Sequence, residues 1–197
     1  MKKKKLFIYI FVILLMVFID QLTKYLVINN FELHEEKPVI GNLLVLTYIR
    51  NSGAAWGSFA GKAALLLVFT FIVFIFIFRI LHRIWDIPKF KPIRICLLFV
   101  IGGAVGNMID RIRFNYVIDF IFFKFINFPV FNIADIFVTL SVIVLVILFI
   151  FKYNDADHDI LLGIKPMDDN NKTTKDEAIS KKTNDKKRGR EEDVEDN

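Results

Sequence analysis

Four long apolar stretches divide the chain, and the segments between them are more polar. The stretches cover residues 6–28, 63–78 (extensible to 81), 93–109 and 133–151. A helix of about 20 apolar residues crosses the roughly 30 Å hydrocarbon core of a bilayer. The pattern therefore predicts an all-α membrane protein with four transmembrane helices.

The first stretch follows a cluster of four lysines, an arrangement that is also typical of a signal peptide. No small-x-small cleavage site follows residue 19, and apolar residues resume after Lys24. We therefore expect a first membrane-spanning helix over residues 6–28. In the third stretch, Gly102 and Gly106 have the small-xxx-small spacing that lets helices pack closely in lipid.

The connections predict a small β-rich element outside the hydrocarbon. Apolar and polar positions alternate loosely over residues 39–49. The segment is rich in β-branched and aromatic residues, which favours short strands. Residues 51–57 are small and include two glycines, which indicates a turn that allows close backbone approach. Residues 110–131 form an aromatic-rich connection expected at the membrane interface. Asn132 is a candidate N-cap for the fourth helix.

Composition agrees with a membrane protein and excludes some other classes. The chain is 55% hydrophobic, with 22 Phe and a mean hydropathy of +0.48. Its single cysteine, Cys96, rules out an internal disulfide and a cysteine-based metal cluster. No basic stripe interleaved with aromatics lies outside the apolar stretches, so we expect no nucleic-acid partner. Residues 154–197 are charged and almost free of aromatics, which predicts a disordered tail after a membrane domain of residues 1–153.

The distribution of basic residues predicts the orientation. The N-terminus holds four lysines and residues 79–94 hold five Lys/Arg, whereas residues 29–62 and 110–132 hold three each despite their greater length. By the positive-inside rule, both termini and the 79–94 turn are cytoplasmic. The β-rich element and the aromatic-rich connection then lie outside.

This topology brings polar residues to one depth near the outer surface. The four acids concerned are Asp20, Asp110, Asp119 and Asp135. Lys24 lies at i+4 from Asp20 on the same helix face, where the two can pair. Ionisable groups in or beside a membrane are expensive, which makes them functional candidates.

The residue types at this depth narrow the chemistry. The outer segments offer no Ser–His pairing, no HExxH motif and no cysteine nucleophile. Two carboxylates that share a proton can activate a water molecule, one as general base and the other as donor to the carbonyl oxygen. Asp110, beside Arg111, is most simply a charge partner that holds the site in shape. The residues alone leave three candidates, Asp110, Asp119 and Asp135, for two catalytic places.

Five blocks in order closely resemble the lipoprotein signal peptidase (signal peptidase II) family. They are Asp20-Gln21-Leu22-x-Lys24, Asn51-x-Gly53-x-Ala55-Trp56, Gly102-Gly103-Ala104-x-Gly106-Asn107-x-Ile109-Asp110-Arg111, Val117-x-Asp119-Phe120 and Phe131-Asn132-x-Ala134-Asp135. Together they cover about residues 6–152. Trp56 stands where phenylalanine is more frequent in the family.

The resemblance implies an intramembrane aspartyl protease of the bacterial cytoplasmic membrane. Such an enzyme removes the signal peptide from diacylglyceryl-modified prolipoproteins on the N-terminal side of the lipidated cysteine. It implies Asp119 and Asp135 as the catalytic dyad, and no metal or cofactor. The remaining site residues would support the dyad: Asn107, Asp110, Arg111 and Asn132 by positioning it, Asp20 and Lys24 by bracing the first helix, and Asn51 and Gly53 by shaping the mouth. The expected partners are the lipidated precursors and membrane lipid, and the expected state is a monomer.

Two other classes of function use the same residues. A small proton-coupled transporter would use the acids as a relay, although transporters usually show internal repeats and sites at the membrane midplane. A non-enzymatic membrane scaffold would account for the glycines and aromatics but not for four acids at one depth.

Overall fold

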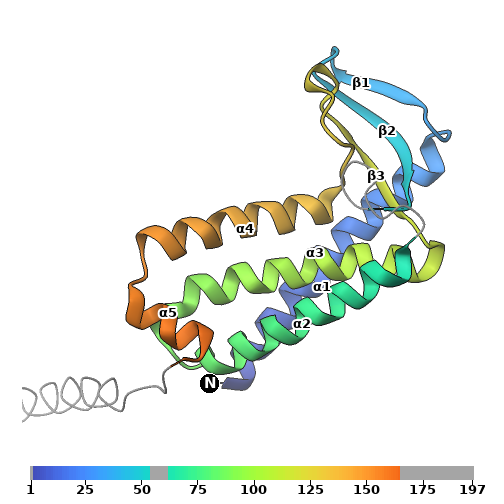
Figure 1. The fold of residues 1–197 in the computed structure, drawn as a ribbon. Coiled ribbons are helices and arrows are strands. Elements are labelled where there is room, and N and C mark those ends of the chain that lie inside the picture. The colour runs from blue at the N-terminus through green and yellow to red at the C-terminus, as the bar shows by residue number, and fades with distance from the viewer. Residues whose placement is uncertain (1, 54–61, 165–197) are drawn as a thin grey trace, which may run out of the picture. The chain divides into compact units, whose positions relative to one another are not determined.

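A computed structural model describes residues 2–53 and 62–164 and contains four helices long and apolar enough to cross a membrane (Figure 1). They are α1 (Lys2–Asn30), α2 (Ala63–Ile84), α3 (Lys91–Phe114) and α4 (Ile133–Phe151). Together with a small sheet they confirm the predicted four-helix membrane fold. Residues 54–57 of the predicted turn lie outside the described residues.

Helix α3 is the centre of the helical bundle. Most of its side chains are buried, whereas most of those on α1, α2 and α4 face outward, as expected for surfaces in contact with lipid. Two of its glycines allow this central position. A Cβ at Gly103 would collide with the backbone of Ala134 in α4, and one at Gly106 would lie 2.5 Å from Asp20 Oδ2 in α1. The predicted close packing along the Gly102–Gly106 stretch is confirmed.

A three-stranded antiparallel sheet stands at the end of the bundle where α1 ends and α4 begins (Figure 1). Its strands are β1 (Glu36–Ile40), β2 (Leu44–Asn51) and β3 (Val117–Phe122), in the order β1-β2-β3. Val27 of α1 and Tyr48, Ile118 and Phe120 of the sheet form a buried cluster that joins the two layers. The strands predicted within residues 39–49 are present, and β3 adds a strand from the aromatic-rich connection.

The third helix is longer than the hydropathy pattern predicts. The pattern predicts an end at Ile109, with Asp110 and Arg111 in the following connection, but α3 continues to Phe114. Buried polar partners of Asp110 let the helix carry a charged residue there. Asn115 then ends the helix in the left-handed conformation, with φ 61°.

The turn between α2 and α3 is closed by a buried arginine. It contains the short 3-10 helix η2 (Pro88–Phe90). Arg94 Nη1 donates to the backbone oxygens of Ile84 at 2.8 Å and Ile87 at 2.6 Å. The same two oxygens also accept from the backbone N–H groups of Ile87 and Phe90, so Arg94 adds a side-chain tie from α3 to a turn that is already hydrogen-bonded.

The chain divides into two compact units, and the second begins at Asp155. It contains helix α5 (Asp155–Leu162), so the expectation of disorder from residue 154 onward is wrong for these eight residues. Asp155 and Asp157 in the first turn favour a helix start, because carboxylates interact well with the free N–H groups there. Residues 165–197 of the predicted tail lie outside the described residues.

Candidate active site

Asp119 lies in β3 with only 2% of its surface exposed. Its two carboxylate oxygens accept hydrogen bonds from two asparagine amides: Asn132 Nδ2 donates to Oδ1 at 2.7 Å, and Asn51 Nδ2 donates to Oδ2 at 2.8 Å. Burial, and after it the nearby charge of Asp135, raise the pKa of Asp119 from 3.8 to about 7. The two asparagine bonds favour the carboxylate and oppose part of this shift.

Asp135 lies in the first turn of α4 and is half-buried. Asn107 Nδ2 donates to Asp135 Oδ1 at 2.7 Å, and the backbone N–H of Asn132 donates to Oδ2 at 3.1 Å. In return, the Asp135 backbone N–H donates to Asn132 Oδ1 at 3.0 Å. This reciprocal pair is a capping box, and the predicted N-cap role of Asn132 is confirmed.

Asn132 therefore joins the two acids, since it bonds to Asp119 through its side chain and to Asp135 through both side chain and backbone. It is fully buried, and its Nδ2 also lies 3.0 Å from Asn107 Oδ1 and 3.3 Å from the Ile118 oxygen. One residue thus fixes the strand that carries Asp119 against the helix that carries Asp135.

The orientation of the Asn107 amide is set by a lysine. Lys24 Nζ donates to Asn107 Oδ1 at 2.9 Å, and Asn132 Nδ2 donates to the same oxygen. An ammonium group has no acceptor, so the group facing it must be the amide oxygen. Asn107 Nδ2 is consequently the end that faces Asp135.

Next to the Asn107 amide lies a buried ionic cluster formed by side chains of α1 and α3. Lys24 Nζ is 2.9 Å from Asp20 Oδ2 and 2.8 Å from Asp110 Oδ2, and all three side chains are at most 2% exposed. The predicted i+4 pairing of Asp20 with Lys24 is confirmed. The predicted pairing of Asp110 with Arg111 is wrong, because the cation that reaches Asp110 is Lys24 from another helix.

The ionic cluster is tied to the elements that carry the two other acids. Asp20 Oδ1 accepts from the Ala134 N–H in the first turn of α4 at 3.0 Å. Asp110 Oδ2 accepts from the Ile118 N–H in β3 at 3.1 Å. Every buried side-chain nitrogen and oxygen in the described part of the chain has a hydrogen-bond partner. The site is thus a single polar network at the sheet end of the bundle.

Two predicted residues take peripheral places. The buried Gly53 donates its N–H to Asn51 Oδ1 at 3.0 Å, so it orients the amide that reaches Asp119. Arg111 is half-buried, and its positive charge lies near the carboxylates of Asp135, Asp119 and Asp110. No hydrogen bond or ion pair links Arg111 to the network among the described residues.

The sequence reasoning missed Gln21. Its Nε2 lies 2.9 Å from Asp110 Oδ1 and 3.2 Å from both the Gly106 oxygen and Asp20 Oδ2. The signal was available, because Gln21 is an uncharged polar residue that follows Asp20 inside an apolar stretch. No group of three or more His, Cys, Asp or Glu residues suited to a metal ion occurs within residues 2–53 and 62–164.

Two aspartates held by neutral amides at one end of a four-helix membrane bundle define a membrane-embedded enzyme of the aspartic type. The model of a family described as signal peptidase (SPase) II matches residues 12–151. The chain belongs to this family, and it is a multi-pass protein of the inner membrane.

Similar proteins agree with this assignment. A lipoprotein signal peptidase from Moorella thermoacetica is 42% identical over 133 residues, covering 67% of this chain and 85% of its own. One from Enterococcus faecalis is 41% identical over 148 residues, covering 75% and 88%. A bacterial membrane enzyme solved by the in meso method at 2.3 Å resolution is 30% identical with a TM-score of 0.64, covering 72% of this chain and 87% of that chain.

Proposed function

We propose that this protein is an aspartic endopeptidase that removes the signal peptide from diacylglyceryl-modified prolipoproteins, cutting on the N-terminal side of the lipidated cysteine. The observation that carries the proposal is the joining of Asp119 and Asp135 through Asn132. Family membership supports the substrate class. The transporter and scaffold alternatives are not favoured by any contact of the site.

In the proposed reaction, Asp135 is the general base and Asp119 the general acid. Asp135 takes a proton from water while the water oxygen attacks the scissile carbonyl carbon. Asp119, protonated in part near neutral pH, donates its proton to the carbonyl oxygen. When the carbon–nitrogen bond breaks, Asp135 passes its proton to the departing nitrogen and Asp119 recovers a proton from the resulting hydroxyl, so both acids return to their starting state.

The remaining site residues position these two acids. Asn107, Asn132 and Asn51 offer N–H groups to the carboxylates, and Gly53 orients Asn51. The ionic cluster of Lys24, Asp20 and Asp110 holds α1 and α3 together and accepts hydrogen bonds from α4 and β3. Arg111 supplies positive charge beside the reacting groups.

We place the site at the outer face of the membrane, with both termini cytoplasmic and the chain acting as a monomer among membrane lipids. The excess of basic residues at the N-terminus and in residues 79–94 supports this orientation. It also matches the substrate, whose cleavage site follows its own membrane-crossing signal helix.

Orientation is tested by labelling introduced cysteines in intact cells with a membrane-impermeant maleimide. Lys37→Cys on the sheet should label, and Lys89→Cys on the α2–α3 turn should label only after the cells are opened. Both positions are exposed, and the native Cys96 is buried. The reverse pattern would place the site on the cytoplasmic side.

The function is tested with purified protein and a purified lipidated precursor, followed by a gel shift. Asp119→Asn and Asp135→Asn should each lower turnover by about 10³-fold or more, because a proton-transfer group is lost. Glu32→Gln is the matched control, since it neutralises an exposed carboxylate at the sheet end outside the network. Thermal unfolding must show that each variant is folded. Near-normal turnover by either folded dyad variant would disprove the assignment.

A further inference from the structure

The end of the sheet farthest from the helices exposes large apolar side chains. Val39, Ile40 and Leu43 come from the β1–β2 turn, and Phe125, Ile126 and Phe128 come from the segment after β3, which contains the 3-10 helix η3 (Lys124–Ile126). Each is between 43% and 60% exposed. Val45 of β2 pairs with Phe122 of β3, which brings the two segments to the same end. We call these six residues the apolar tip.

Aromatic rings connect the apolar tip to the start of a membrane helix. Phe125 contacts Phe123 with ring centroids 6.5 Å apart, and Phe123 and Phe128 contact Phe131 at 5.6 and 5.8 Å. Phe131 directly precedes Asn132, the N-cap of α4. The exposed aromatic surface is therefore continuous with a helix whose own outer face is apolar.

Charges near the tip are already paired. Lys124 is the sole charged residue among residues 120–131, and its Nζ lies 2.5 Å from Glu36 Oε2. Lys37 in β1 lies 3.2 Å from Glu35 Oε1. Paired charges lower the cost of approaching a membrane, and phenylalanine with a flanking lysine suits the boundary between headgroups and acyl chains.

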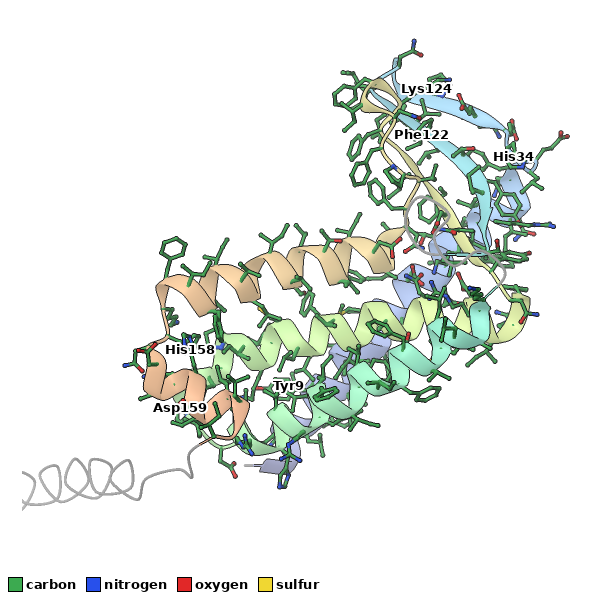
Figure 2. The ribbon with its side chains drawn as sticks, in the orientation of Figure 1. Tyr9, His34, Phe122, Lys124, His158 and Asp159 are labelled. Atoms are coloured by element: carbon green, nitrogen blue, oxygen red, sulfur yellow. The ribbon has the colours of Figure 1, made fainter. Side chains whose placement is uncertain are left out.

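The apolar tip extends sideways from the helical bundle, over the region that membrane lipid would occupy next to α4. Figure 1 shows the sheet leaving the bundle on the side of α4, and Figure 2 labels Phe122 and Lys124 near its far end. An exposed apolar patch beside a membrane-spanning helix marks a contact surface. We propose that the apolar tip inserts into the headgroup–acyl boundary of the outer leaflet and rests on membrane lipid.

Insertion would fix the depth of the reacting groups. Asp119 lies three residues before Phe122 in the strand that ends at the tip. A strand held in the interface at one end and by Asn132 at the other cannot change depth independently of the bilayer. This consequence rests on the proposed function, whereas insertion itself does not.

Insertion is tested by quenching of tryptophan fluorescence with brominated acyl chains. Trp56→Phe and Trp85→Phe remove the native tryptophans, and Phe125→Trp adds one at the tip. Leu33→Trp is the matched control, because Leu33 is 43% exposed, like Phe128, but precedes β1 at the end of the sheet opposite the apolar tip. The proteins are reconstituted into phosphatidylcholine vesicles with and without brominated chains.

The Phe125→Trp protein should lose about half of its emission in brominated vesicles, since interfacial burial of about 5–10 Å reaches the acyl boundary. The Leu33→Trp protein should be quenched much less. Equal quenching at both positions, or none at the tip, would overturn the proposal. Quenching at the tip that is lost as the protein-to-lipid ratio rises would also overturn it, in favour of contact with a second copy.

A second arm separates this proposal from the function. Phe125→Trp should be quenched equally in the Asp119→Asn background, because insertion requires no catalysis. A Phe125→Ser/Ile126→Ser variant should cleave lipidated precursor about tenfold less in vesicles than wild type but similarly in detergent micelles. An equal loss in both media would assign the residues to folding and not to the membrane contact.

Discussion

Two pairs of aspartates lie in the same polar network, yet they are held in opposite ways. Asp20 and Asp110 share a cation, Lys24, with both distances below 3.0 Å. Asp119 and Asp135 share a neutral residue, Asn132, and their remaining side-chain donors are also asparagine amides. The first pair lies deep in the helix packing, and the second lies where a strand meets a helix end.

The difference explains how four acids at one depth can have two roles. A lysine that pairs with two buried carboxylates ties together the two helices that carry them, which suits a structural role. Asp119 accepts from two amides and forms no ion pair, and burial together with the charge of Asp135 raises its pKa to about 7. A carboxyl group that gains and loses a proton near neutral pH is suited to proton transfer.

Removing Lys24, the cation shared by Asp20 and Asp110, should have the largest effect on stability. Lys24→Met leaves two buried carboxylates without their partner and should cost about 3–5 kcal/mol of unfolding free energy. Thermal unfolding in detergent micelles measures the loss. The matched control is Lys37→Met, which removes an exposed partner of Glu35 and should cost less than about 1 kcal/mol. Equal losses of unfolding free energy for the two variants would contradict a structural role for the Lys24 ion pairs.

Removing the Asn132 amide, which Asp119 and Asp135 share, should have a smaller effect on stability and a large effect on turnover. Asn132→Ala removes the Nδ2 donor to Asp119 and the Oδ1 acceptor that caps α4 at Asp135, whereas the backbone N–H that donates to Asp135 remains, so turnover should fall by about 10²–10³-fold. The lost cap should cost about 1 kcal/mol of stability. Single-turnover cleavage of lipidated precursor, corrected for the folded fraction, measures the first effect. Asn30→Ala, at an exposed asparagine on α1, is the control.

The pH dependence sharpens the comparison further. If Asp119 must be protonated, turnover should fall about tenfold per pH unit above its pKa of about 7. Asn51→Ala removes a bond that favours the carboxylate, which raises this pKa and moves the fall to higher pH. A pH–rate profile of both proteins measures the shift. A shift to lower pH would show that Asn51 stabilises the protonated form.

Stability should follow the same titration. The folded pKa of Asp119 exceeds its ordinary value of 3.8, so the folded state binds the proton more tightly. The stability from this proton is complete below about pH 4 and is lost as the pH rises to about 7. Unfolding temperatures of wild type should fall across that window, and Asp119→Asn should flatten the curve. An unchanged slope in the variant would assign the dependence to other groups.

The helices and the meeting of the four acids could be predicted from sequence because both follow from long, one-dimensional patterns. Hydropathy gave the fourth helix its bounds at residues 133–151, and charge asymmetry placed the polar residues at one end. The apolar stretch of the third helix ends at Ile109, before the charged Asp110, so hydropathy alone predicts a helix that is too short. Its continuation depends on Lys24 and Gln21, which come from another helix.

The pairing of the acids could not be predicted because it is set by three-dimensional contacts. Asp110 was assigned to its sequence neighbour Arg111, whereas Lys24, 86 positions away, provides the cation. The residues alone left three aspartates for two places. Only the neighbours across helices and strand distinguish a carboxylate bound by an ammonium group from one bound by amides.

The first turn of α4 carries a further consequence. The N–H groups at the start of a helix normally have no helical acceptor, but here Ala134 donates to Asp20 and Asp135 donates to Asn132. Those two amide protons can exchange with solvent only when the contacts that assemble the site have opened. Their exchange rates therefore report the equilibrium between an assembled and a disassembled site, in the absence of any substrate.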